Sequence, residues 1–188
     1  MLDLPFQFPS LHDPHLRWYS HAQWLPRPSA TLQSWLMDPG SLTHRLKAMS
    51  HGKFNVQVLE EGWAQQCSPS LLQCFLPHVA RQRMWSRKVL LRSGDTPWVA
   101  AHTLIPISSM IGPLKQLRNL RDRPLGEFLF QDPQLQRLQL EIAQRGELWG
   151  RRSLFYLQHR PILVAEFFLP SLLLEDANRL QAMNGRAC

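Results

Sequence analysis

Residues 84–108 read MWSRKVLLRSGDTPWVAAHTLIPIS, and this stretch decides the fold. Two runs of branched and aromatic residues flank the short polar segment Ser93-Gly94-Asp95-Thr96. This pattern is typical of a β-hairpin, because Gly and Asp favour the tight turn between two antiparallel strands. It therefore predicts that the sheet of this protein is antiparallel.

Further strands are predicted on both sides of this hairpin. Apolar residues alternate with polar ones at residues 53–66 and 138–144, which favours half-buried strands. Residues 148–170 hold two more strands that turn near Gln158-His159-Arg160. The sequence thus predicts a sheet of about six strands.

Helical patterns occupy residues 29–40, 41–49 and 124–130. Ser29 or Thr31 can cap the first of these helices, and Ser41 can cap the second. Helices before and between antiparallel strands define the α+β class.

The 188 residues suffice for one domain with a sizeable core. Residues 1–28 are rich in Pro and His without a clear period, and we expect an irregular arm there. We expect the domain to span residues 29–170, followed by a short helical or frayed tail at 171–188.

The net charge of +7 is compatible with a nucleic acid, an acidic surface or a small anionic substrate as partner. Nucleic-acid binders tend to cluster Lys and Arg, whereas the arginines here are scattered along the chain. Arginine pairs well with carboxylates. We therefore expect a small-molecule anion and no nucleic acid.

The sequence also indicates the cellular location of the protein and whether it uses a cofactor. The longest apolar run, residues 161–174, is shorter than the ~18 residues of a membrane span, and the N-terminus lacks the pattern of a secretory signal. Three cysteines without metal-like spacing favour reduced thiols in the cytoplasm. Because no nucleotide, nucleophile or zinc motif is present, we expect no cofactor and no metal.

One carboxylate interrupts the apolar run RPILVAEFFLP at residues 160–170. On a strand, Glu166 shares a face with Ile162, Val164 and Phe168. A carboxylate among apolar residues must find a partner or take up a proton. Glu166 is therefore either a functional residue or a structural one that reaches solvent or an Arg.

Arg87 has a similar position, since it shares a strand face with Trp85, Val89 and Leu91. It either binds an anion or lays its stem on Trp85 and reaches solvent. His102, in the facing strand, can point to either side. An Arg and a Glu on apolar faces would suit a small aromatic-like acid.

The sequence resembles the chorismate pyruvate-lyase family from about Trp24 to Leu169. The resemblance is carried, in order and spacing, by GDTPWVAAHTLIPIS (94–108), RPLGEFLF (123–130), GELWGRRS (146–153) and RPILVAEFFLP (160–170), and more weakly by WLMDPGSLTHRL (35–46) and GKFNVQVLEEGW (52–63). It implies a single antiparallel sheet of about six strands with helices packed on one side. It also implies a cofactor-free bacterial enzyme that converts chorismate to 4-hydroxybenzoate and pyruvate for ubiquinone synthesis.

The resemblance implies roles for five residues. Arg87 and Glu166 would be catalytic and bind the ring carboxylate and the ring hydroxyl, and the backbone amides near Leu42 and Leu125 would complete the carboxylate site. His102 stands where the family has an Arg, so it would bind substrate in a pH-dependent way. Leu42 and Leu125 would lie on flaps that open to release a tightly held product.

Two other expectations accompany this activity. We expect a monomer without stable membrane insertion. The alternative function is a non-catalytic domain of the same fold that senses aromatic acids.

Overall fold

The predicted hairpin forms in a computed structural model, which describes residues 16–20, 27–65, 67 and 69–184. Strands β3 (Met84–Ser93) and β4 (Thr96–Pro106) pair antiparallel around Gly94, whose φ of 56° suits a glycine in a tight turn. A β-bulge between Leu91 and Arg92 shifts the register of this pair by one residue.

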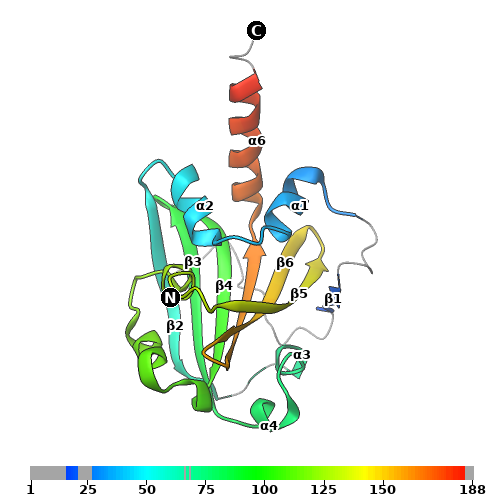
Figure 1. The fold of residues 1–188 in the computed structure, drawn as a ribbon. Helices are drawn as coiled ribbons and strands as arrows, with labels where there is room; N and C mark the ends of the chain where they lie inside the picture. The colour runs from blue at the N-terminus through cyan, green and yellow to red at the C-terminus, as the bar shows by residue number, and fades with distance from the viewer. Residues whose placement is uncertain (1–15, 21–26, 66, 68, 185–188) are drawn as a thin grey trace.

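Within the described residues, seven antiparallel strands form one open sheet in the order β1-β5-β6-β7-β4-β3-β2 (Figure 1). The remaining strands are β1 (Tyr19–Ser20), β2 (Phe54–Trp63), β5 (Gln136–Arg145), β6 (Leu148–Leu157) and β7 (Arg160–Phe168). The α+β class and the antiparallel sheet are confirmed. The additional strand is β1, which pairs with β5 and lies in the segment expected to be irregular.

Helical elements of the described residues pack on one face of the sheet, and we call this the pocket face. The main ones are α1 (Ala30–Leu36), α2 (Leu42–Met49), the 3-10 helix η3 (Gly112–Asn119) and α5 (Leu125–Leu129). Ser29 and Ser41 cap α1 and α2 as predicted, since their side chains accept from Leu32 N and His44 N. The short 3-10 helix η2 (Ile107–Ser109) follows β4.

In the part of the chain that the structure describes, the opposite face of the sheet carries two helices that were not predicted from the sequence. Leu71 of α3 (Pro69–Leu72) and Val79 of α4 (Pro77–Ala80) pack on Leu90, Leu104 and Phe167 in a second core. Helices therefore cover both faces, although those on the pocket face are longer.

The C-terminal segment forms α6 (Pro170–Asn184), which leaves the end of β7 and projects away from the sheet (Figure 1). Its first turns are anchored to α1, because Leu172 is buried and Asp176 accepts a hydrogen bond from Trp35 Nε1 at 2.8 Å. Within the described residues, no helix is long and apolar enough to cross a membrane.

Candidate active site

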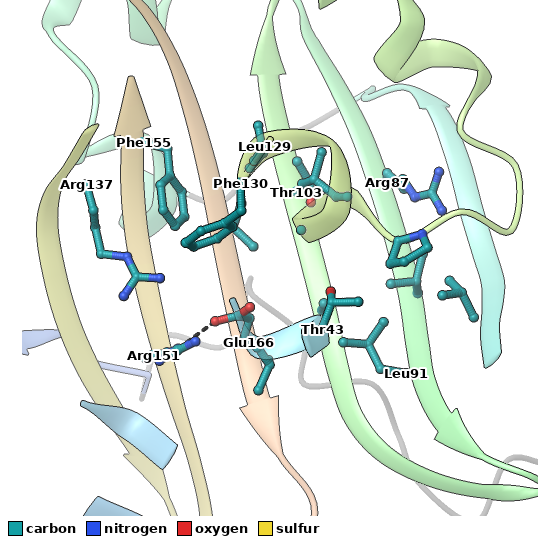
Figure 2. A pocket seen from close by; sticks show the side chains of 18 residues that line it. Thr43, Arg87, Leu91, Thr103, Leu129, Phe130, Arg137, Arg151, Phe155 and Glu166 are labelled. Atoms are coloured by element: carbon teal, nitrogen blue, oxygen red, sulfur yellow. Dashed lines mark hydrogen bonds and ion pairs between the residues drawn. The ribbon is translucent and has the colours of Figure 1, made fainter. Parts of the chain in front are cut away.

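A pocket lies between the pocket face of the sheet and the first turns of α2 and α5 (Figure 2). Side chains from six strands of the described chain contribute to it, from β2 on one side to β5 and β6 on the other. Its walls are largely apolar and include Val89, Ala101, Val164, Phe130 and Phe155. Such walls suit a flat ring, and the charged residues that interrupt them would orient it.

Arg87 lines one end of this pocket and is almost fully buried, with 4% of its side chain exposed. Its Nη1 donates to Glu61 Oε1 at 3.2 Å, and its Nη2 donates to the backbone carbonyls of Arg121 and Arg123 at 2.6 and 3.1 Å. These bonds use three of the five N–H groups of the guanidinium. Burial lowers the pKa of Arg87, and the charge of Glu61 opposes this shift.

Glu166 lies further along the pocket, to the left of Arg87 in Figure 2. The carboxylate has a protein partner, because Arg151 Nε donates to Glu166 Oε2 at 2.6 Å. The carboxylate therefore has an Arg partner and also lines the pocket, so the pairing alone does not decide between a functional and a structural role. Since this hydrogen bond uses Oε2, Oε1 can accept from a ligand.

Arg151 lines the pocket beside Glu166 and was not among the residues predicted for the site. It is completely buried, and its Nη1 donates to the carbonyls of Trp35 and Asp38 at 3.0 and 2.9 Å. These bonds tie the end of α1 to the sheet beside Glu166. The adjacent Arg152 points to the opposite face, where its Nε donates to Glu141 at 2.7 Å.

Arg137 of β5 is the second cation at this end of the pocket. Its Nη1 donates to the Asp38 carbonyl at 2.9 Å, and its guanidinium lies 4.8 Å from the centre of the Phe155 ring. Burial and the charge of Arg151 lower the pKa of Arg137, whereas Glu166 and Asp38 oppose this shift.

Leu42 and Leu125, the predicted flap residues, are the first residues of α2 and α5 and both line the pocket. No side chain caps α5, so its first backbone amides are available to an anion. The two helices meet closely, since a Cβ on Gly126 would lie 2.6 Å from Thr43 Oγ1. Lys47 of α2 also forms an ion pair with Glu127 of α5.

His102 does not line the pocket, unlike the other four predicted site residues. Its side chain lies on the opposite face of the sheet, where Nε2 is 2.8 Å from the Ser86 hydroxyl. The expectation that His102 contacts the substrate is therefore not supported by the geometry. The arginines that supplement Arg87 inside the pocket are Arg137 and Arg151.

The described residues contain no cluster of three or more His, Cys, Asp or Glu side chains that could hold a metal ion. The chemistry of the pocket is that of three guanidinium groups, one carboxylate and backbone amides between apolar walls. Fold and site together define an α+β protein with a pocket that suits a small, flat molecule with more than one negative charge.

The chain belongs to the chorismate lyase family, whose model matches residues 15–178. It is 35% identical to a chorismate pyruvate-lyase of Erwinia tasmaniensis over 81% of this chain and 88% of that protein. It is 38% identical to one from Proteus mirabilis, over 73% of this chain and 80% of that protein. The corresponding values for one from Escherichia coli are 34%, 83% and 93%.

Proposed function

We propose that this chain is a lyase that removes pyruvate from chorismate and releases 4-hydroxybenzoate. The observation that carries the proposal is the pocket itself, in which Arg87 and the Arg151–Glu166 pair stand among apolar walls. The relatives named as chorismate pyruvate-lyases support the same activity.

In the proposed complex, Arg87 binds the ring carboxylate with the N–H groups that Glu61 and the two carbonyls leave unused. The backbone amides of Leu42 and Leu125 add donors from the first turns of α2 and α5. The ring lies against Val89, Ala101 and the other apolar walls. Glu166 Oε1 accepts a hydrogen bond from the ring hydroxyl.

The reaction is an elimination that completes an aromatic ring. The bond between the ring carbon and the ether oxygen breaks, and its electron pair leaves with the enolpyruvyl group. The neighbouring ring carbon, which bears the hydroxyl, loses a proton, and its C–H electron pair forms the new ring double bond. Because aromatisation provides the driving force, the protein contributes positioning and electrostatic stabilisation, and Glu166 is placed to assist proton transfer.

Release of the product requires α2 and α5 to separate. The two helices are held together by the close contact between Gly126 and Thr43 and by the Lys47–Glu127 ion pair. A site shaped for a flat ring also fits the product, so opening of these flaps would limit its release.

The cellular location, the oligomeric state and the pathway are also part of the proposal. The enzyme would act in the cytoplasm as a monomer, and its product would enter ubiquinone synthesis.

The direct test is to mix the purified protein with chorismate and to measure pyruvate and 4-hydroxybenzoate. We expect both products in equal amounts, well above the uncatalysed rate. Arg92→Ala is a matched control, because Arg92 lies on the same strand as Arg87 but outside the pocket, where it contacts Gln57 and Asp95. Product formation at the uncatalysed rate would overturn the proposal.

A further inference from the structure

Two guanidinium groups converge near Glu166. Arg137 comes from β5 and Arg151 from β6, and both lie on the same side of Glu166, away from Arg87 (Figure 2). The register of β5 and β6 and the shared carbonyl of Asp38 hold them in place, because both Nη1 atoms donate to that oxygen at 2.9 Å.

Both arginines retain buried donors without a partner. Arg151 Nη2 and Arg137 Nε are buried nitrogen atoms, and neither has a hydrogen-bond partner within the described part of the chain. Leaving such a donor unpaired costs free energy, most of all on a charged group, so each one calls for an explanation. A ligand acceptor that reaches these nitrogen atoms would remove the cost.

The charges at this end of the pocket are also unbalanced. Arg137 and Arg151 bring two positive charges, and Glu166 brings one negative charge. Asp38 offers both arginines its backbone carbonyl, whereas its carboxylate faces Arg45 at 3.2 Å. One positive charge therefore remains to be matched by an anion.

We propose that Arg137 and Arg151 bind the second carboxylate of the substrate, the one on the enolpyruvyl ether. This inference rests on the proposed function. In chorismate the ether is on the ring carbon next to the one that bears the hydroxyl. If Arg87 holds the ring carboxylate and Glu166 the hydroxyl, the ether carboxylate must lie at the Glu166 end of the pocket, where these two arginines are.

The same two cations would then act on the leaving group. When the ether bond breaks, its electron pair moves onto the oxygen of the departing enolpyruvate, which later takes up a proton to become pyruvate. Guanidinium groups that hold the adjacent carboxylate stabilise this growing negative charge. The product 4-hydroxybenzoate lacks that carboxylate, so Arg137 should contribute to substrate affinity and turnover but little to product affinity.

The test compares chorismate turnover with product binding in Arg137→Gln. Removal of one partner of a desolvated charge pair should lower kcat/KM for chorismate about 30-fold or more. The Kd for 4-hydroxybenzoate, measured by calorimetry, should change less than about threefold, within one weak hydrogen bond. Arg92→Gln, a partly buried arginine on β3 outside the pocket, should change neither quantity.

A second variant helps to distinguish a loss of substrate binding from a folding defect. Arg151→Lys keeps the charge beside Glu166 but removes the two-pronged geometry, so we expect turnover of chorismate to fall more than product affinity, which falls to a smaller extent because Arg151 also holds Glu166. Retained 4-hydroxybenzoate affinity in either variant shows that its pocket is intact.

Three outcomes would contradict either the inference about Arg137 and Arg151 or the proposed function. Equal losses of turnover and product affinity would place the ring carboxylate, not the ether carboxylate, on these arginines. Unchanged kcat/KM in an active Arg137→Gln variant would overturn the inference alone. A parent protein that releases no pyruvate from chorismate would overturn the proposed function, and the inference with it.

Discussion

Arg151 Nε donates a hydrogen bond to Glu166 Oε2 over 2.6 Å, and these two residues are direct register partners on β6 and β7. Arg151 is completely buried, whereas 15% of the Glu166 side chain is exposed. The carboxylate that interrupts an apolar strand is thus one half of a buried charge pair. Loss of either charge leaves the other without compensation, which is strongly unfavourable in a protein interior.

The first prediction concerns Glu166→Gln. We expect turnover to fall by about tenfold or more, because an amide keeps the shape and the hydroxyl contact but cannot take up a proton. The free energy of unfolding should also fall, by about 1–3 kcal/mol, because Arg151 loses its counter-ion. Steady-state kinetics and urea unfolding measure the two effects.

The control for this variant is Glu60→Gln, which changes an exposed carboxylate paired with Lys88 on the neighbouring strand. It should alter neither quantity appreciably. Unchanged turnover in Glu166→Gln would make Glu166 a structural residue.

The second prediction concerns the contact between the two flap helices. Gly126→Ala places a methyl group 2.6 Å from Thr43 Oγ1, so α2 and α5 must move apart. We expect a several-fold weaker Kd for 4-hydroxybenzoate, because the amides of α5 are displaced from the bound carboxylate. Thr43→Ala in the same chain should restore part of the affinity, since it removes the hydroxyl that clashes.

Gly62→Ala provides the matched control, because a Cβ at Gly62 meets nothing within 4 Å. If Gly126→Ala binds 4-hydroxybenzoate as tightly as the parent protein does, the flaps do not form part of the binding site.

The alternation of strand residues identified some of the residues that line the pocket. It placed Glu166 with Val164 on one face and Arg87 with Val89 and Leu91 on another, and all five residues line the pocket. The hairpin turn and the serine caps of α1 and α2 were predicted for equally local reasons. Such features depend on residues close together in the sequence.

The face on which His102 lies could not be predicted in this way. Counting from the turn pair Ser93 and Thr96 would place His102 opposite Arg87 and on the same face. The bulge between Leu91 and Arg92 shifts the register by one residue, so Thr103 becomes the partner of Arg87 and His102 moves to the other face. The sequence pattern of the hairpin does not predict a bulge at that point.

Arg151 could have been found from the sequence, whereas Arg137 could not. The turn of two residues at Gln158 and His159 makes Leu157 and Arg160 partners, and counting back along the hairpin pairs Arg151 with Glu166. Arg137 reaches the pocket from β5, whose register contains a shift between Arg137 and Gln139. Its position depends on tertiary packing.

The third prediction is that the free energy of unfolding depends on pH through Cys74, which lies on the opposite face of the sheet. Burial raises the pKa of the Cys74 thiol from its ordinary value of 9.0 to about 12. The folded state then binds more protons than the unfolded state between these values. The stabilisation is therefore fully present below pH 9 and is lost as the pH rises towards 12.

Cys74→Ser removes this ionisation while keeping a small side chain. The difference in unfolding free energy between parent and variant should shrink as the pH rises above 9, by up to about 1 kcal/mol per pH unit. Urea unfolding at several pH values measures it. A constant difference would mean that the thiol does not titrate differently on unfolding.

The fourth prediction concerns metal ions. Because elimination with aromatisation needs only positioning and charge stabilisation from Arg87 and Glu166, we expect full turnover after treatment with EDTA. The assay compares pyruvate release before and after dialysis against the chelator. Loss of activity that a divalent ion restores would contradict this prediction.

The fifth prediction concerns Arg87. Arg87→Ala should weaken 4-hydroxybenzoate binding by tenfold or more, because the ring carboxylate loses a desolvated charged partner. Part of the loss arises because Arg87 also donates hydrogen bonds to the backbone carbonyls of Arg121 and Arg123, just before α5, and the variant removes these bonds. Calorimetry of the variant beside Arg92→Ala separates this loss from a general effect of removing an arginine from β3.

The orientation of the ring in the pocket is the central claim, and a crystal structure of the complex with 4-hydroxybenzoate tests it most directly. We predict that the carboxylate lies within about 3 Å of the Arg87 guanidinium and that the hydroxyl lies at a similar distance from Glu166. A ring bound the other way round, with its carboxylate on Arg137 and Arg151, or bound outside this pocket, would contradict the claim.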